Sequence, residues 1–282
     1  MGEWLPANGA KRRLEMRMRI NKRFEKLRER KEKGFIAYIT AGDPSLSGTV
    51  EMVKRLADVG VDLIELGIPF SDPIADGRVN QAAAERALAA GANWRGILDT
   101  VQEIRENVDL PIIFFSYLNP LYAVGFDKAM KAAARAGIDG LLLLDLPIEE
   151  AEPFDAAFSE NMLDKISLIT PTTPPERMDR ILKTASGFVY CVSRTGVTGV
   201  QASIAGGAKD VLIETRRHTD LPIALGFGIS TPAQAADAAT MADAVIVGSA
   251  IVKRFDEERH NSNGRRAVAK WVGTLVRAVK EV

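Results

Sequence analysis

The chain has 282 residues, of which 46% are hydrophobic and 26% are charged, so it can bury the core of one large folded domain. Lysine plus arginine and aspartate plus glutamate are equal at 37 each, which argues against nucleic acid or an anionic membrane as the main partner. One cysteine and two histidines exclude an intrachain disulfide, and we expect no bound metal. With no long apolar run and no secretory leader pattern, a cytoplasmic location is expected.

The N-terminal region differs in character from the rest of the chain. Residues 1–19 are expected to form a flexible or helical extension, and residues 20–282 a single barrel domain. Residues 11–33 carry many basic side chains among apolar ones, which is typical of an amphipathic helix. Because acidic side chains dilute its basic face, a helix that leads into the domain and covers one end of it is favoured over a helix on a membrane surface.

Short apolar runs with the character of strands recur along the chain. In chain order, the predicted strands cover residues 35–40, 62–66, 112–115, 140–144, 166–169, 187–192, 222–225 and 244–247. Nearly every position in them is apolar, which indicates strands that are buried on both faces, as in a parallel sheet covered by helices.

Segments with helical periodicity separate these runs. They cover residues 47–59, 80–90, 94–107, 126–136, 149–158, 175–185 and 231–241. Two of them lie between the second and third strands, so an extra helix is expected after strand two. An apolar stripe over residues 265–280 predicts a closing helix at the C-terminus.

The alternation of strand and helix predicts an α/β fold, and eight such units predict a (β/α)8 TIM barrel. An open, doubly wound sheet is the alternative, although six strands would complete such a sheet and eight would crowd it. In a barrel of this kind, the active site lies at the carboxyl ends of the strands. The residues that follow each predicted strand are therefore the candidates for chemistry.

The most distinctive stretch covers residues 65–77, which read ELGIPFSDPIADG. Glu65 lies where an apolar strand is expected to end, and Asp76 lies in the loop beyond it. A buried carboxyl group without a partner has a raised pKa and can exchange protons near neutral pH. For Glu65 alone, an exposed turn or a helix cap is the alternative interpretation.

Glycine-rich loops follow the last three predicted strands, over residues 196–199, 225–230 and 247–250. Glycine lets backbone N–H groups approach a phosphate closely, and the start of a helix adds a favourable partial charge. Each loop alone is also compatible with an ordinary turn. Since all three lie at the ends of consecutive strands, they predict a phosphate site.

Aromatic side chains are expected on the same rim of the barrel. They are Tyr38, Phe115, Tyr117, Tyr190 and Phe227. For each of them alone, packing in the core is the favoured interpretation, because aromatic side chains bury large areas. Together with Glu65 and the glycine loops, they indicate a pocket for a molecule with a flat aromatic head and a phosphorylated tail.

These motifs resemble the tryptophan synthase alpha subunit family. The resemblance extends from about residue 20 to the C-terminus, and the PFSDP stretch at residues 69–73 is its most specific part. The other matching segments cover residues 35–44, 145–147, 193–199, 226–230 and 247–249. The resemblance implies a carbon–carbon lyase of tryptophan biosynthesis, which cleaves indole-3-glycerol phosphate to indole and glyceraldehyde 3-phosphate.

The resemblance also implies roles for individual residues. Glu65 and Asp76 match the two catalytic acids of the family. The positions that match the indole pocket are Tyr38, Tyr117, Tyr190, Thr198 and Phe227, and those that match the phosphate clamp are Gly199, Gly228, Gly248 and Ser249. Arg78 stands where the family usually has proline, so we expect the loop over residues 70–80 to be mobile without a ligand or partner.

The resemblance implies no cofactor in this chain and one protein partner, the pyridoxal-phosphate-dependent beta subunit, in an alpha-beta-beta-alpha heterotetramer. Asp145 and the loops after strands two and six are the candidate contact surface. Two alternatives stay open. One is a subunit whose main role is to dock on and activate the beta subunit, and the other is a different phosphosugar aldolase or isomerase on the same fold. A Schiff-base aldolase needs a lysine at a strand end, which the predicted strands lack.

Overall fold

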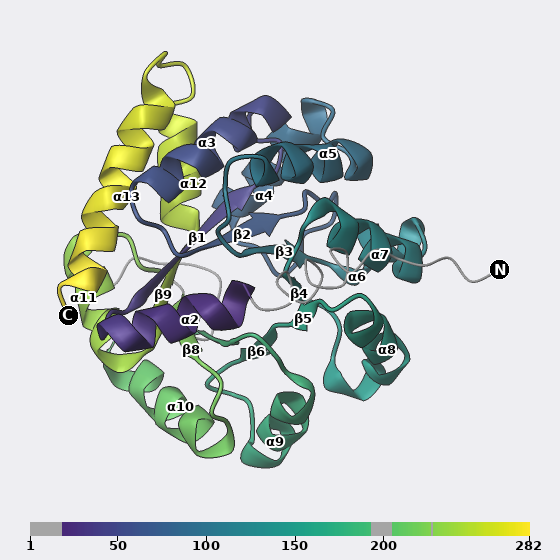
Figure 1. The fold of residues 1–282 in the computed structure, drawn as a ribbon, viewed down its shortest axis with the longest axis vertical. Coiled ribbons are helices and arrows are strands. Elements are labelled where there is room, and N and C mark those ends of the chain that lie inside the picture. The colour runs from purple at the N-terminus through teal and green to yellow at the C-terminus, as the bar shows by residue number, and fades with distance from the viewer. Residues whose placement is uncertain (1–18, 193–204, 227) are drawn as a thin grey trace, which may run out of the picture.

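The structure is a computed structural model that describes residues 19–192, 205–226 and 228–282. In this part of the chain, parallel strands form a barrel inside a ring of helices, as predicted (Figure 1). Three predicted site residues, Thr198, Gly199 and Phe227, lie outside the described residues, as does the predicted extension except for Arg19.

Neighbouring strands of the barrel are all parallel. The strands are β1 (Gly34–Thr40), β2 (Leu63–Gly67), β3 (Ile112–Ser116), β4 (Gly140–Leu143), β5 (Asp164–Lys165), β6 (Ser167–Ile169), β7 (Val189–Val192), β8 (Ile223–Gly226) and β9 (Ala244–Val247). Their order is β5-β4-β3-β2-β1-β9-β8-β7-β6. Because only Ile166 separates β5 from β6, these two short strands together take the place of the fifth predicted strand and bring the ends of the sheet together.

Helices connect the strands and cover the outside of the barrel (Figure 1). They are α2 (Arg19–Arg30), α3 (Leu46–Asp58), α4 (Arg78–Ala89), α5 (Trp94–Arg105), α6 (Leu118–Ala123), α7 (Phe126–Ala136), the 3-10 helix η1 (Ile148–Glu150), α8 (Glu152–Glu160), α9 (Pro175–Thr184), α10 (Ala205–His218), α11 (Pro232–Met241), α12 (Ser249–Glu257) and α13 (Gly264–Lys280). The two helices predicted between strands two and three are confirmed as α4 and α5, and the closing helix as α13. The prediction lacked α6 and α10, because α6 is only six residues long and α10 begins with an Ala-Gly-Gly stretch that disfavours a helix.

Capping side chains define where several helices begin. The Ser45 side chain accepts a hydrogen bond from the Gly48 N–H at the start of α3, and the Asn93 side chain does the same for Gly96 at the start of α5. Thr231 forms a capping box with Gln234 at the start of α11. By contrast, α4 starts from Gly77 without a side-chain cap, so the helix that follows the Asp76 loop lacks this local support.

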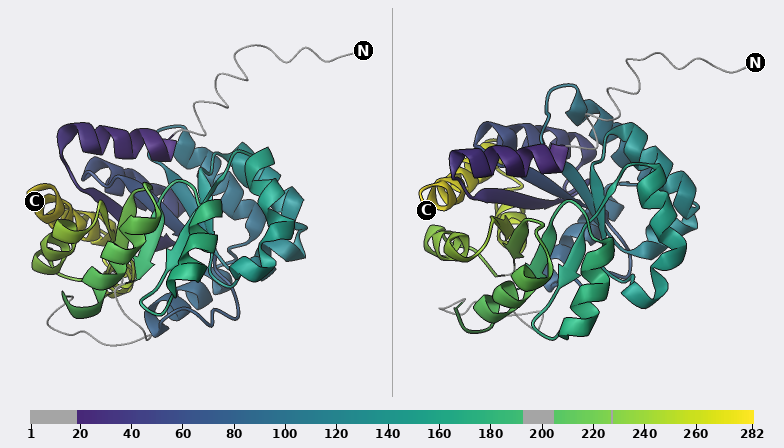
Figure 2. Two further views of the ribbon diagram at one scale, coloured as in Figure 1. Left: turned by 90° about the horizontal axis from the view of Figure 1, so that it is seen from below. Right: turned by 60° about the horizontal axis from the view of Figure 1, so that its bottom comes forward.

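The lead-in helix covers one end of the barrel, as predicted. Ile20, Phe24 and Leu27 of α2 pack in one cluster with inward-facing strand residues such as Ile36 and Leu63. Figure 2 shows α2 lying across the end of the barrel from which the strands start. Since this end is filled by packed side chains, the opposite end, where the strands finish, is the one available for a site.

Candidate active site

Glu65 lies within β2 and points into the barrel. It follows Leu63 by two residues, so both side chains lie on the same face of the strand, and Leu63 belongs to the inner core. In the sheet it pairs with Tyr38 on β1 and Ile113 on β3. The expectation that the strand runs out at Glu65 is wrong by two residues, because β2 continues to Gly67 and pairs with the end of β1.

The Glu65 carboxyl group is almost completely removed from water, with a relative exposure of 1%. Its Oε1 is buried and has no hydrogen-bond partner. Burial without a compensating charge raises the pKa of Glu65 to about 8, because the charged form is poorly solvated. This residue therefore carries its proton at neutral pH and is suited to act as a general acid.

Asp76 lies in the loop between β2 and α4 and is held by two side chains. The Tyr117 hydroxyl donates to Asp76 Oδ2 at 3.0 Å and accepts a hydrogen bond from the Ala75 N–H at 2.9 Å. Asn80 Nδ2 donates to Asp76 Oδ1 at 3.4 Å. Burial raises the pKa of Asp76, while the hydrogen bonds from Tyr117 and Asn80 favour its charged form and oppose the rise. Asp76 is thus partly buried, and it is more exposed than Glu65.

Glu65 and Asp76 both influence the pKa values of two tyrosines, Tyr38 and Tyr190. Burial raises the pKa of Tyr38, and the charges of Asp76 and Glu65 raise it further. Burial, and then the charges of Glu65 and Asp76, likewise raise the pKa of Tyr190. Tyr38 and Glu65 are partners in the sheet, and the charges of both acids reach Tyr38 and Tyr190, so these four residues belong to one region of the barrel. The structure therefore brings together residues from β1, β2 and β7.

The aromatic side chains form the walls around these acids. The Tyr38 ring meets the edge of the Phe115 ring, with 5.1 Å between the ring centroids. A methyl group at Gly67 would lie 2.3 Å from the Tyr38 hydroxyl, and one at Gly226 would lie 2.6 Å from the Tyr190 hydroxyl. Glycine at these two positions thus makes the space in which both tyrosine rings lie.

The glycine loops after β8 and β9 lie side by side, because these strands are neighbours in the sheet. Gly228 is exposed, has a positive φ of 76° and has open space where a side chain would extend. Gly248 precedes Ser249, the first residue of α12, and no side chain caps this helix start. Backbone N–H groups at such an uncapped helix start are available to an anion.

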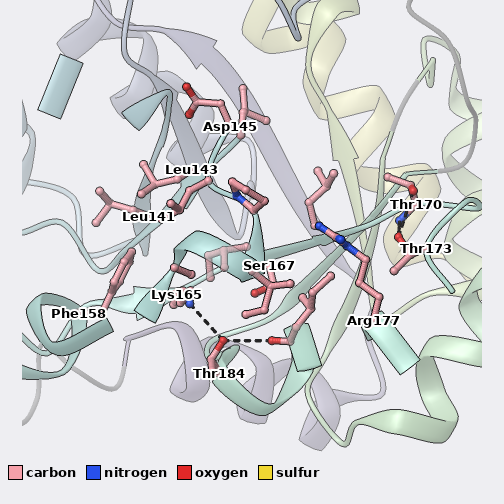
Figure 3. Close-up of a pocket in the computed structure, with 18 of the residues that line it drawn as sticks. Leu141, Leu143, Asp145, Phe158, Lys165, Ser167, Thr170, Thr173, Arg177 and Thr184 are labelled. Atoms are coloured by element: carbon pink, nitrogen blue, oxygen red, sulfur yellow. Dashed lines mark hydrogen bonds between the residues drawn. The ribbon is translucent and has the colours of Figure 1, made fainter. Parts of the chain in front are cut away.

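A pocket of about 430 Å³ opens between β4 and β6, on the side of the barrel where β5 and β6 meet (Figure 3). The basic side chains Lys165 and Arg177 line this pocket, and both form ion pairs. Lys165 pairs with Asp155 at 2.5 Å, and Arg177 pairs with Glu149 at 2.8 Å. Figure 3 shows Thr184 beside Lys165, with a hydrogen bond of 3.1 Å between them. Since neither basic group is free, the pocket is less suited to a phosphate than the glycine loops are.

Three residues near the site have no role in the sequence interpretation. Leu144, directly after β4, and Leu168, within β6, pack against the inner core and are partly buried. Their leucine side chains gave no signal that distinguishes them from other core residues. Asn80 binds Asp76. Its position four residues after Asp76, at the start of a helix, is the signal that could have identified it.

Metal and membrane features are absent from the described ranges. No group of three or more histidine, cysteine, aspartate or glutamate side chains in this part of the chain could hold a metal ion. No helix among residues 19–192, 205–226 and 228–282 is both long and apolar enough to cross a bilayer.

Comparison with known proteins gives one consistent result. The sequence model of the family described as "Tryptophan synthase alpha chain" matches residues 24–280. The chain is 43% identical to the tryptophan synthase alpha chain of Carboxydothermus hydrogenoformans, over 94% of this chain and 99% of that protein. It is 44% identical to the alpha chain of Geotalea uraniireducens, over 94% of this chain and 98% of that protein.

Solved structures agree with the sequence relatives. A crystal structure of tryptophan synthase subunit alpha from Legionella pneumophila superposes with a TM-score of 0.86 at 36% identity, covering 94% of this chain and 99% of that chain. A chain from the structure of Mycobacterium tuberculosis tryptophan synthase superposes with a TM-score of 0.85 at 33% identity, covering 93% and 98%.

Proposed function

Because the chain belongs to the tryptophan synthase alpha chain family, which cleaves indole-3-glycerol phosphate in tryptophan biosynthesis, we propose that Glu65 and Asp76 carry out this cleavage. The chain is thus a carbon–carbon lyase, and its products are indole and glyceraldehyde 3-phosphate. The observation that carries the assignment of the residues is the buried carboxyl group of Glu65, whose Oε1 has no partner and whose pKa is raised to about 8.

Glu65 transfers a proton twice in the proposed mechanism. Direct cleavage of the bond between C3 of the indole ring and the glycerol chain would leave an unstable carbanion, so C3 is protonated first. Glu65 donates this proton, and the positive charge spreads to the ring nitrogen. The Glu65 carboxylate then accepts the proton of the adjacent glycerol hydroxyl. The O–H electrons form the aldehyde, and the electrons of the broken C–C bond return to the ring to give indole.

Asp76 stabilises the cation that forms between these two steps. Its carboxylate accepts a hydrogen bond from the indole N–H, where the positive charge develops. The hydrogen bond from the Tyr117 hydroxyl holds Asp76 Oδ2 and favours the charged form of the carboxylate. Burial mainly sets the pKa of Glu65, whereas hydrogen bonds from Tyr117 and Asn80 oppose the effect of burial on the pKa of Asp76. This difference allows the two carboxyl groups to take different roles.

The rim of the barrel supplies the proposed binding site for the substrate. The indole ring lies among Tyr38, Phe115, Tyr117 and Tyr190, whose rings offer flat apolar surfaces. The phosphate binds the backbone N–H groups of Gly228, Gly248 and Ser249. Thr198 and Phe227 are assigned to the indole pocket, and Gly199 to the phosphate clamp, on the resemblance to the family alone.

The family implies the beta subunit as partner, and we place the contact on the loops after β2, β3 and β4. The loop after the sixth predicted strand, which is also a candidate, lies outside the described residues. Ile74 and Tyr122 are large apolar side chains on the first two of these loops, with exposures of 82% and 65%. Asp145, on the third, is exposed and accepts a hydrogen bond from the Leu118 N–H at 2.7 Å. An alpha-beta-beta-alpha heterotetramer in the cytoplasm is the proposed assembly, with pyridoxal phosphate in the beta subunit and no cofactor in this chain.

Indole release by the isolated chain tests the assignment of the acids. Glu65→Gln keeps the shape of the side chain but cannot donate a carboxylic proton, so kcat should fall by roughly 10²- to 10⁴-fold. Asp72→Asn is the matched control, since Asp72 is an exposed acid in the same loop whose side chain binds Ser71. A Glu65→Gln chain with the turnover of the wild type would overturn the proposal.

The second candidate function is docking on and activating the beta subunit, which the exposed Ile74 and Tyr122 favour. Mixing the purified chain with the beta subunit separates the two roles. If the wild-type chain releases no indole by itself but stimulates the partner, docking is the main role. If the chain releases indole alone, and Glu65→Gln abolishes release but retains stimulation, both roles belong to it.

A further inference from the structure

Two buried side-chain oxygens lack a hydrogen-bond partner in the part of the chain that the structure describes: Glu65 Oε1 and Asn80 Oδ1. They lie on β2 and at the start of α4, so the loop that carries Asp76 joins them. Buried polar atoms in folded proteins nearly always have partners, and an exception calls for a ligand or an energetic compensation. The mechanism above accounts for Glu65, but not for Asn80.

Asn80 reaches the Asp76 loop because it is the third residue of α4, one helical turn after the loop ends. Its Nδ2 donates to Asp76 Oδ1 at 3.4 Å, while the Tyr117 hydroxyl donates to Asp76 Oδ2 at 3.0 Å. The carboxylate is thereby held from both sides. Neighbouring Gln81 binds only the backbone of the same loop, through the Asp76 carbonyl at 2.8 Å and the Pro73 carbonyl at 3.5 Å.

The orientation of the Asn80 amide follows from its partner. A carboxylate that already receives a hydrogen bond from Tyr117 accepts but does not donate, so the NH2 group of Asn80 must face Asp76. The carbonyl oxygen of Asn80 is then the atom without a partner. It lies on the same amide group, and therefore close to the Asp76 carboxylate.

We propose that Asn80 is a further substrate-positioning residue: its NH2 group holds Asp76, and its carbonyl oxygen shares with Asp76 the hydrogen bond that the indole N–H donates. The inference rests on the proposed function, because it needs Asp76 to bind the indole N–H. The substrate would satisfy the one buried acceptor that the mechanism leaves unpaired. Asn80 thus makes the site selective for a ring that carries an N–H group.

Two unreactive probes test this selectivity by binding alone. The first is a 3-propylindole with a phosphate at the end of the propyl chain, which has no hydroxyl group. The second has the same shape, with sulfur in place of the ring N–H. Both probes offer the same phosphate and ring surface, so a difference in affinity between them reports hydrogen bonds to the ring N–H.

The nearly isosteric Asn80→Leu should weaken the indole probe by roughly 10-fold and leave the sulfur probe within about 2-fold of the wild type. Gln81→Met is the matched control from the next position of the helix. It loosens the backbone of the loop and should change the affinity for both probes alike. Melting temperatures of the unliganded variants show that each has folded, and Asn80→Ser provides a smaller substitution if the leucine variant does not fold.

The pH dependence of kcat/KM gives a second readout, which a purely structural role would not move. Asn80 lowers the pKa of Asp76 by donating to its charged form. Tyr117 also faces this carboxylate, and Tyr38, Tyr190 and Glu65 lie in the same enclosed region. In Asn80→Leu, the loss of activity on the acid side should move to higher pH by roughly one pH unit. In Asn80→Asp a second carboxylate beside Asp76 should move it further.

Failure of this inference differs from failure of the proposed function. If Asn80→Leu binds both probes as the wild type does, or weakens both equally, Asn80 does not position the ring N–H and the inference is wrong. If instead the wild type releases no indole, the proposed function itself is wrong. If Asp76→Asn keeps the preference of the wild type for the indole probe, the proposed role of Asp76 is wrong, whatever Asn80 does. An indole-specific loss in both Asp76→Asn and Asn80→Leu supports the two together.

Discussion

At the scale of single residues, burial of the Glu65 carboxyl group has two effects: it makes the residue suitable as a proton donor, and it lowers the stability of the fold when the group is charged. An acid whose pKa rises from its ordinary value of 4.5 to about 8 on folding holds a proton more tightly in the folded state. Unfolding then releases this proton between these two pH values, so the free energy of unfolding falls as the pH rises through that window.

This linkage predicts that Glu65→Gln is more stable than the wild type at neutral pH. Glutamine removes the ionisation, so the gain should be close to zero near pH 4 and roughly 1–3 kcal/mol at pH 7. Urea unfolding of both proteins at pH 5 and pH 7 would measure it. A gain of the same size at both pH values would show that the burial of Glu65 does not control its ionisation.

At the scale of elements, α4 links the Asp76 loop to the rest of the barrel and is weakly supported at its start. Gly77 precedes it with extended backbone, φ −73° and ψ 161°, and offers no side-chain cap. Arg78 is the first residue of the helix and is exposed. This is the helix position that proline prefers, and the backbone of Gly77 is compatible with a following proline.

Arg78→Pro should therefore stabilise the chain by about 0.4–1 kcal/mol, because proline restricts the unfolded chain without loss of a helical hydrogen bond. The same substitution should make the loop over residues 70–80 more ordered, which hydrogen exchange of its amides would show. Arg78→Ala controls for the loss of the charge. A proline variant less stable than the alanine variant would mean that the loop needs a backbone shape that proline forbids.

A second link ties α4 to two other elements at the same end of the barrel. Arg86 on α4 binds Asp43, after β1, through two hydrogen bonds of 2.9 and 2.7 Å. It also lies 3.4 Å from Asp256 on α12, the helix that begins at the proposed phosphate clamp. The Asp43 side chain is only 6% exposed, so it depends on Arg86 for compensation.

Arg86→Met should lower the free energy of unfolding by roughly 2–4 kcal/mol, since it leaves the buried carboxylate of Asp43 without its ion pair. The partial exposure of Arg86 keeps the loss below that of a fully buried pair. Arg86→Lys keeps the charge but cannot form both parallel hydrogen bonds, and an intermediate loss is expected. Chemical denaturation of the three proteins measures the series. Equal stability of wild type and Arg86→Met would show that the ion pair contributes nothing.

At the scale of the whole molecule, the loops after β2, β3 and β4 place exposed apolar side chains on the rim that also carries Asp76. We expect Tyr122→Asp to weaken the complex with the beta subunit by at least about 10-fold, because it puts a charge into a desolvated contact. Ile213→Asp on α10 is the matched control, since Ile213 is also exposed, at 46%, but lies away from these loops. Titration with the purified beta subunit measures both, and an equal loss in the two variants would contradict the proposed face.

The barrel and the position of its site could be predicted because their signals are local. Apolar runs, helical periodicity and glycine loops each depend on a few neighbouring residues, and each of the eight predicted strands has a counterpart in the structure, with β5 and β6 together in the place of the fifth. Short elements such as α6, and the division of one strand into β5 and β6, could not be predicted, because they carry too few residues to show a period. The single-domain boundary at residue 20 and the roles of the site residues stay predictions.

The sequence by itself determined the kind of fold, the family and the chemical types gathered at the barrel rim. The tertiary structure alone decided how deeply Glu65 is buried, that Tyr117 reaches Asp76 from 41 residues away, and that Asn80 is left with an unpaired oxygen. The physical reason is that a pKa depends on the water removed and on the donors brought near by distant parts of the chain. Those quantities exist only once the barrel has closed.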